Sequence, residues 1–333
     1  MAILRHLIPL FLAALLAGCY ESFDPNVGTS PVLCVNSLIT AGEPVEISVT
    51  HTWVFNDMQD EKNHTVDDAV ITVYVNGTPV PDGYIAHERD EIRIVADSPR
   101  YGRAEASVTV PQAVPFSAVS LEPEVTDVWK APRQPMTAYL GFSMRIAATV
   151  ADPHPADDFF QLSYTWRSPA GASGDDPAGV SGAIFTSFSP GTFDYNAEPI
   201  FKEHIGVFES VMGDDEDLRM IFSDRQFAGR SHTLGLHFEN ASYSVVAPEY
   251  DPDLYDCSIT FTLASVSRSF YDRALYIWQR DAGILGDLGD LGFAEPMWAY
   301  SNVSTGAGTV AARALTTCTV SLRDFLESAL ADR

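Results

Sequence analysis

Positive charge is scarce in this chain. Its 333 residues include 20 Lys and Arg against 45 Asp and Glu, which gives a formal net charge of −25 at pH 7. Binding to nucleic acid needs a basic surface against the phosphates, so this composition argues against a nucleic-acid partner. An anionic bilayer would also repel such a body. Membrane attachment therefore requires a lipid or a hydrophobic segment.

Cysteines and long apolar segments are scarce as well. Four cysteines are too few for a disulfide-stabilised scaffold. No segment reaches the ~18 consecutive apolar residues of a transmembrane helix. Hydrophobic residues still make up 46% of the chain, which is enough for a packed core and excludes wholesale disorder. The length suggests two domains.

Residues 1–18 predict a lipoprotein signal peptide. Arg5 gives a positive amino-terminal region, and the apolar segment that follows is too short to span a bilayer. Leu16, Ala17, Gly18 and Cys19 resemble the bacterial lipobox, in which the cysteine receives a diacylglycerol and becomes the new amino terminus. The alternative is an ordinary secretory signal followed by a chance cysteine.

The residues after Cys19 bear on localisation. No aspartate follows Cys19 directly, so the usual inner-membrane retention signal is absent. Glu21 and Asp24 weakly resemble the acidic surface-export signal of Bacteroidota lipoproteins. We expect a lipid-anchored protein of the outer membrane, with the cell-surface face favoured over the periplasmic face.

The mature body predicts a mainly β fold. Residues 45–51 and 69–75 alternate apolar and polar side chains, and Asn76-Gly77 is a strong hairpin signal. We expect a tether over residues 19–30, a small β-sandwich over 31–112 and a linker over the proline-rich residues 113–137. A larger β-rich domain would follow over 138–333. Residues 270–280 and the chain end after Ser321 predict two short helices within it.

Four stretches resemble a known family. They comprise residues 31–44, then 151–153 leading into 159–166, then 221–230, and finally 271–280 with 295–308. Their order is similar to that in Bacteroidota lipoproteins of domain-of-unknown-function family 4249 (DUF4249). The resemblance implies an immunoglobulin-like amino-terminal part, a larger β-rich part and frequent association with TonB-dependent receptors. It supplies no catalytic residues, and Cys34 departs from the aliphatic residue that is usual there.

Few local patterns suggest a cofactor or metal. Gly306 to Ala311 match G-x-G-x-x-A with Glu327 downstream, but too little chain follows for a Rossmann unit, so a turn is favoured. His232 and His237 fall on opposite faces of a predicted strand, and His154 lies between two prolines in a predicted solvated loop. The acidic loops 213–217 and 251–256 could supply calcium ligands but are more typical of solvated surface. We expect no resident metal or cofactor.

Three cysteines are left after lipidation of Cys19. One disulfide and one odd thiol is the simplest arrangement, and we favour Cys257 with Cys318 and a buried Cys34. Three unpaired thiols are the alternative.

Exposed aromatic residues could form a binding platform, although core packing is the commoner role for such side chains. The candidates are Trp53, Phe55, Trp129, Trp298 and Tyr300.

The sequence favours a non-enzymatic function. Neither Gly-x-Ser-x-Gly nor His-Glu-x-x-His occurs, and no Ser/His/Asp arrangement has local support. We expect an accessory or ligand-binding partner of a TonB-dependent transport system. One alternative is a structural or adhesive cell-surface protein. The other is a surface hydrolase, since 45 acids permit many carboxylate pairs.

Overall fold

The computed structural model describes residues 30–52, 64–131, 136–169, 185–202, 220–247, 251–281 and 299–331. Leu16, Ala17, Gly18 and Cys19 therefore lie outside the described residues, as do Trp53, Phe55, Trp298 and the acidic loop 213–217. The described chain is mainly β, as predicted, with a sandwich-like arrangement of sheets and two α-helices. Within it, no helix is both long and apolar enough to cross a membrane.

Along the chain the strands form three successive groups, which differ from the three sheets that they build. The first group is β1 (Leu33–Thr40), β2 (Ser48–His51), β3 (Val70–Val75), β4 (Thr78–Val80), β5 (Glu91–Ser98) and β6 (Gly102–Thr109). The second is β7 (Phe116–Lys130), β8 (Met136–Ala151), β9 (Phe159–Arg167), β10 (Phe185–Ser189) and β11 (Thr192–Phe193). The third is β12 (Ile221–Ser223), β13 (Ser231–Ala247), β14 (Ser258–Val266) and β15 (Val310–Ser321).

The helices are short and lie late in the chain. Two 3-10 turns, η2 (Pro199–Lys202) and η4 (Pro252–Tyr255), connect strands. The α-helices α3 (Arg268–Asp281) and α5 (Arg323–Ala331) coincide with the two predicted from periodicity and from the cap at Ser321. The Ser321 hydroxyl accepts a hydrogen bond from the Arg323 N–H at 3.3 Å, so it serves the start of α5 as expected.

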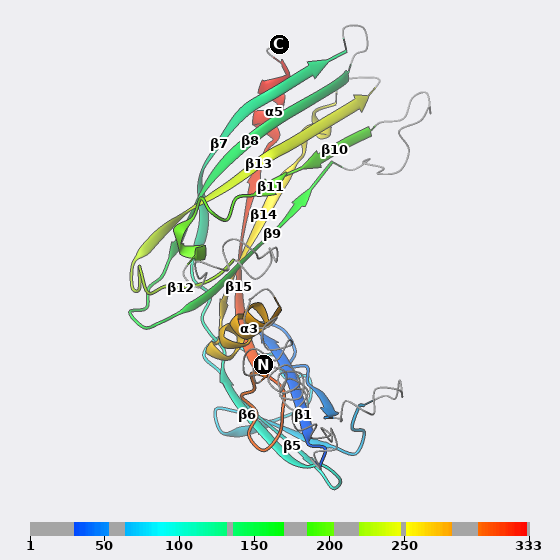
Figure 1. The fold of residues 1–333 in the computed structure, drawn as a ribbon, viewed down its shortest axis with the longest axis vertical. Helices are drawn as coiled ribbons and strands as arrows, with labels where there is room; N and C mark the ends of the chain where they lie inside the picture. Colours follow the sequence, from blue (N-terminus) through cyan, green and yellow to red (C-terminus); the bar gives the residue numbers. More distant parts are fainter. Residues whose placement is uncertain are drawn as a thin grey trace, which may run out of the picture.

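The strands form three sheets (Figure 1). A six-stranded sheet has the order β12-β9-β14-β15-β1-β2, a second sheet has β10-β13-β8-β7 with β11 beside β13, and a third has β4-β3-β5-β6. The long strand β15 joins the two ends of the molecule. It pairs antiparallel with β14 from Val266↔Arg313 to Ser258↔Ser321 and parallel with β1 from Ser37↔Val310 to Thr40↔Arg313.

One face of the six-stranded sheet covers two separate cores. Alternate residues of a strand point to opposite faces, so Val310, Ala312 and Val320 of β15 share a face. Val310 and Ala312 are buried in the core shared with the four-stranded sheet, whereas Val320 is buried in the core shared with the β7–β8–β13 sheet. The small sandwich predicted over 31–112 is thus completed by carboxy-terminal residues.

Aromatic side chains fill the larger core. Phe142, Phe160, Phe238 and Phe261 are fully buried there, and the rings of Tyr164 and Phe238 meet edge to face at 5.0 Å. Such edge-to-face contacts add specific geometry to the burial of apolar area. The larger core therefore lies between β8 and β13 of the second sheet and the inner face of β9 and β14.

The linker predicted over residues 113–137 is wrong for most of its length. Residues 116–130 form β7, which pairs with β8 from Phe116↔Val150 to Lys130↔Ala138. Strand β7 is the edge of its sheet, a position at which prolines such as Pro123 are tolerated, and two register shifts mark bulges along it. The prolines indicate an edge strand here and not a connection between domains.

Helix α3 lies where the two sandwiches meet, against the other face of the six-stranded sheet (Figure 1). Its residues Tyr271 and Ala274 are buried against Phe159, Ile221 and Val266 in a small third core. The helix covers only part of that face. The uncovered part, toward β1 and β2, is the location of the groove described next.

Candidate functional site

A groove of about 650 Å³ lies between α3 and the strands β1 and β2. Its apolar lining includes Leu38, Ile47, Phe270 and Ile277, and its charged lining residues are Glu46 and Arg273. The volume falls within the range of roughly 300–1,000 Å³ that is usual for small-molecule sites. Composition and size both suit a small, largely apolar ligand with polar groups.

The period of β1 explains why this groove exists. Leu33, Val35 and Ile39 point into the small core and are almost fully buried. The residues between them point the other way, so Asn36 and Leu38 line the groove. Leu38 keeps 44% of its surface exposed, which is unusual for leucine in a central strand. The groove is thus a direct product of the sheet that builds the fold.

The polar side chains of the groove are held in place. Arg273 Nη1 donates to Thr309 Oγ1 at 3.3 Å, and Asn36 Oδ1 accepts from the Thr309 N–H at 3.0 Å. These bonds join α3, β1 and the segment before β15 around one rim. Sequence reasoning missed Glu46, Arg273 and Leu38, because no local pattern distinguishes them from ordinary surface residues.

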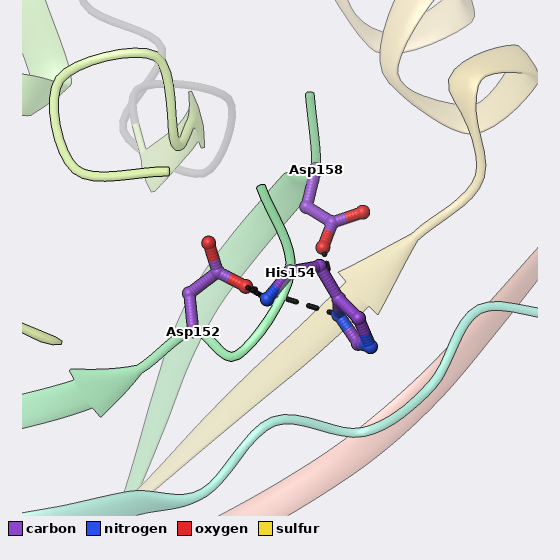
Figure 2. A group of neighbouring side chains, drawn as sticks. All are labelled: Asp152, His154 and Asp158. Atoms are coloured by element: carbon purple, nitrogen blue, oxygen red, sulfur yellow. Dashed lines mark hydrogen bonds and ion pairs between the residues drawn. The ribbon is translucent and has the colours of Figure 1, made fainter. Parts of the chain in front are cut away.

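A second feature is a cluster of acids around His154, between β8 and β9 (Figure 2). Asp152 is buried, and its two oxygens accept the N–H groups of His154 and Gly229, each at 2.9 Å. His154 Nδ1 lies 3.2 Å from Asp158 Oδ2 and 3.8 Å from Asp152 Oδ1. His154 is therefore half-buried and bonded, which corrects the prediction of a solvated loop residue.

Asp224 lies next to this cluster and is bonded to one of its members. It follows β12, is fully buried, and accepts the Asp158 N–H on Oδ1 at 2.9 Å. Its Oδ2 has no hydrogen-bond donor among the residues that the structure describes. Burial, with the neighbouring carboxylates of Asp152 and Asp158, raises the pKa of Asp224 to about 6. Burial and Asp152 raise the pKa of Asp158 in the same direction.

The imidazole of His154 has a defined tautomer. Its Nε2 lies 2.9 Å from Gln112 Oε1, and that oxygen accepts from Arg89 Nη2 at 2.7 Å. Because arginine only donates, the Gln112 atom is the carbonyl oxygen, and Nε2 of His154 must carry a proton. Nδ1 faces the carboxylates of Asp152 and Asp158 and carries either a lone pair or a second proton.

Sequence reasoning used the Asp152 and Asp224 segments only as marks of a family. The signal available was an acid immediately beyond the end of a strand, at Ala151-Asp152 and Ser223-Asp224. Nothing in the spacing of 72 positions between them indicates that β8 and β12 end side by side. The structure brings both segments together through the bonds of Asp152 to Gly229 and of Asp224 to Asp158.

The two histidines of β13 lie on the predicted faces, but the buried Nε2 of His232 has no hydrogen-bond partner among the described residues. His232 and His237 lie on opposite faces of β13, and His232 shares its face with the buried Leu234 and Leu236. The ring of His232 stacks on Phe227 at 5.0 Å. His237 lies 3.7 Å from Asp194 and, with Glu239, forms a second group of potential ligands at a more exposed position.

The acidic loop at 251–256 is neutralised by protein groups. Asp251 caps η4, Arg323 Nη2 donates to Asp253 at 2.8 Å, and Arg167 pairs with Asp256. A calcium ion is not needed to balance these charges. The loop therefore acts as a bonded turn between β13 and β14.

The glycine-rich turn before β15 has a packing role. The Val35 N–H donates to the Ala307 carbonyl at 2.9 Å, and a Cβ on Gly308 would lie 2.2 Å from the Val35 carbonyl oxygen. A Cβ on Gly306 would lie 2.6 Å from the Leu33 carbonyl oxygen. Both glycines are required for close contact with β1, which explains the G-x-G pattern without a nucleotide.

The predicted disulfide between Cys257 and Cys318 is absent, and all three described cysteines are free. Cys318 is opposite Phe261 in the β14–β15 register, four positions from Cys257. That offset corresponds to about 13 Å along the strand, whereas a disulfide needs Cα atoms within about 7 Å. Cys34 is half-buried, and its Sγ contacts Asn36 Nδ2 at 3.3 Å.

The described aromatic candidates differ in exposure. Trp129 on β7 is 54% exposed and lies opposite Tyr139 on β8, which is 38% exposed. Tyr300 is half-buried. Trp166 is 52% exposed at the end of β9, although Phe160 and Leu162 on the same face are buried. The aromatic pair on β7 and β8 is thus a surface feature.

Comparison with known proteins gives one match. A family model described as a domain of unknown function (DUF4249) matches residues 20–317. No curated protein and no solved structure matches. The match spans nearly the whole chain after the predicted signal peptide and includes both the groove and the acidic cluster.

Proposed function

The chain belongs to the DUF4249 family, and from this premise we propose that it is a non-enzymatic, lipid-anchored binding protein of the bacterial outer membrane. It captures a small ligand as an accessory of a TonB-dependent transport system. The lipid on Cys19 holds the body beside the transporter, which raises the effective concentration of the captured ligand there.

The observation that carries this proposal is the groove beside α3. It is built on strands of the scaffold, so the site needs little rearrangement before binding. Its apolar lining gives affinity, and Arg273 and Glu46 offer one charged group of each sign for the polar end of a ligand. We infer a ligand with an apolar body and at least one polar or charged group.

One observation favours the alternative of an adhesive surface protein. The exposed pair Trp129 and Tyr139 gives a flat aromatic surface on the outer face of the β7–β8 sheet. Aromatic residues of this kind are enriched in the centres of protein interfaces. The same surface would also suit contact with the transporter. A substitution of Trp129 therefore tests the protein–protein contact without altering the groove that binds the ligand.

The first test is purification of the tagged, lipidated protein from its own outer membrane in mild detergent, with mass spectrometry of bound proteins. Recovery of a stoichiometric TonB-dependent receptor supports the accessory role. Recovery of the protein alone from well-solubilised membranes overturns it in its stable-complex form. The Trp129→Ala variant, purified in parallel, reports whether the aromatic pair makes the contact.

The groove itself is tested with 1-anilinonaphthalene-8-sulfonate, which has an apolar body and one negative charge. The Leu38→Trp variant fills the groove from an already exposed position, and we expect it to abolish the fluorescence increase of the bound probe. Leu315→Trp is the matched control, since Leu315 is 38% exposed on the same strand face as the groove but does not line it. Equal probe binding by both variants would exclude the groove as the site.

A further inference from the structure

One edge of the four-stranded sheet is only partly covered. Strand β4 is the last strand of this sheet on that side, and it pairs with β3 from Val73↔Val80 to Val75↔Thr78. Strand β3 begins earlier, at Val70, and among the described residues its first positions pair with β5 alone. The start of β3 is therefore an exposed strand edge.

The backbone of Ile71 points to this edge. Just after β3, the Asn76 N–H donates to the Glu91 carbonyl of β5 at 2.9 Å, and alternate residues of a strand direct their backbone groups to the same side. Even-numbered residues of β3 therefore bond to β5, whereas odd-numbered residues face β4. Because the β4 ladder ends at Val73, no described strand meets the N–H and C=O of Ile71.

An apolar slot opens beside this edge. Its volume is about 350 Å³, and its apolar lining includes Ile71 and Val73 from β3 and Val45 and Ile47 from the segment before β2. Ile71 points inward with Val73 but stays 37% exposed, whereas Val73 is buried. A strand added beside Ile71 would direct alternate side chains inward, so one of them would enter the slot.

The neighbouring part of the sheet edge is protected, but the start of β3 is not. Pro79 of β4 lies opposite Tyr74, whose backbone bonds to β5, so the backbone nitrogen of Pro79 faces away from β3. Proline at such a position removes the N–H that a further strand would use. Val70, on the outer face of β3, is 67% exposed. The start of β3 is thus an apolar edge to which an extended segment can add.

The charge around this edge indicates the kind of partner. Asp67 and Asp68 lie in the turn before β3, Asp82 lines the slot, and all three are exposed. Asp97, at the facing end of β5, lies 4.0 Å from Arg103. A second copy of a chain with a net charge of −25 would be repelled, whereas lysine or arginine beside an apolar residue would be attracted.

We propose that the open edge of β3 binds an extended segment of another protein, which adds as a further strand beside Ile71. The segment places one apolar side chain in the slot and carries lysine or arginine on either side of it. A free peptide would gain few backbone bonds at so short an edge, so the occupant is a segment of a folded protein that also contacts Val70. Ligand capture by the groove beside α3 is not required for this contact.

The probe for the test is a fluorescein-labelled peptide, Lys-Thr-Leu-Thr-Lys, added to the full chain in mild detergent at low ionic strength. We expect its fluorescence anisotropy to rise and to saturate. Methylation of the leucine nitrogen should weaken binding at least about tenfold, because it removes the N–H that pairs with Ile71 and leaves the charge unchanged. Replacing both lysines by glutamate should weaken binding at least as much.

Ile71→Pro removes the edge N–H without loss of a bond to β5, and it should weaken binding of the peptide at least about tenfold. Val119→Pro is the matched control, since Val119 is also 67% exposed and lies on the edge strand β7, at a bulge outside the β7–β8 register. Circular dichroism checks that both variants are folded. Slower hydrogen exchange of residues 69–75 in wild type with peptide present gives a readout that needs no variant.

Equal binding of the parent peptide and its N-methylated or glutamate form would overturn the proposal. So would unchanged binding by folded Ile71→Pro, or no binding by wild type. A dimer in analytical ultracentrifugation that Ile71→Pro dissociates would overturn it too, because the occupant of the edge would then be a second copy of the chain.

Discussion

Replacing Asp224 by asparagine should stabilise the protein at neutral pH. The asparagine keeps an oxygen that accepts the Asp158 N–H. Its amide group then offers donors toward the carboxylate of Asp152, where wild-type Asp224 presents a second negative charge. The substitution thus removes a buried like-charge contact with almost no change in volume.

The size of the effect follows from the raised pKa of Asp224, about 6 against an ordinary value of 3.8. A raised carboxyl pKa means that the folded state holds its proton longer than the unfolded chain does. Stability is therefore lost as pH rises from about 4 to about 6 and stays lower above that. The difference of about two pKa units corresponds to about 3 kcal/mol in the free energy of unfolding. Asp152 and Asp224 share this titration as a pair.

The assay is urea unfolding followed by tryptophan fluorescence, with chelator present, at pH 4.5, 5.5, 6.5 and 7.5. We expect the stability of Asp224→Asn relative to wild type to grow with pH and to level off above about pH 6.5. Asp82→Asn, in an exposed turn, controls for the change in net charge. A difference that is independent of pH, or an Asp224→Asn protein less stable than wild type at pH 7.5, would refute the reasoning.

Three further predictions test other parts of the structure. Gly308→Ala should lower the free energy of unfolding by more than about 2 kcal/mol in urea, because its Cβ meets a backbone oxygen at a positive φ, whereas Gly83→Ala, with open space around it, should cost only about 1 kcal/mol. Iodoacetamide at pH 8 should leave native Cys257 unlabelled, since burial raises the pKa of its thiol to about 12, and mass spectrometry should detect no Cys257–Cys318 disulfide. Cys19→Ser should abolish incorporation of labelled palmitate and release the protein from the membrane fraction, whereas continued labelling would exclude Cys19 as the lipid site.

Most individual strands could be predicted because each has one buried face. In β6, for example, Ala104, Ala106 and Val108 are buried and alternate with Glu105, Ser107 and Thr109, and this alternation is visible in the sequence. The helices α3 and α5 were predictable for the same reason at a different period. Local patterning thus gave the fold class and the positions of the main elements.

The pairing of distant segments could not be predicted. Nothing in residues 33–40 indicates that their partner lies at residues 310–313, since any strand of suitable pattern could occupy that edge. The proline signal of residues 113–137 was real, but it marks an edge strand, and edge and linker prolines look alike in a single sequence. The disulfide prediction failed because register cannot be read from spacing.

The candidate site was hidden for the same reason. Asp152 and Asp224 are each an acid just beyond a strand end, which is a common position for a solvated side chain. Only the antiparallel pairing of β9 and β12 buries them together. The groove likewise depends on which strand α3 leaves uncovered, and that is a property of the assembled sheet.

The parallel contact between β1 and β15 also sets the order in which the protein can be completed. Asn36 and Thr309, which bond across this contact, are 273 residues apart in the chain. During synthesis the first strand emerges long before its partner, so the edge of β1 that pairs with β15 stays without hydrogen bonds until then. A chain interrupted before β15 would lack one wall of each core. The whole polypeptide must therefore be synthesised before either half can close, and a chaperone that covers exposed strand edges would assist its folding.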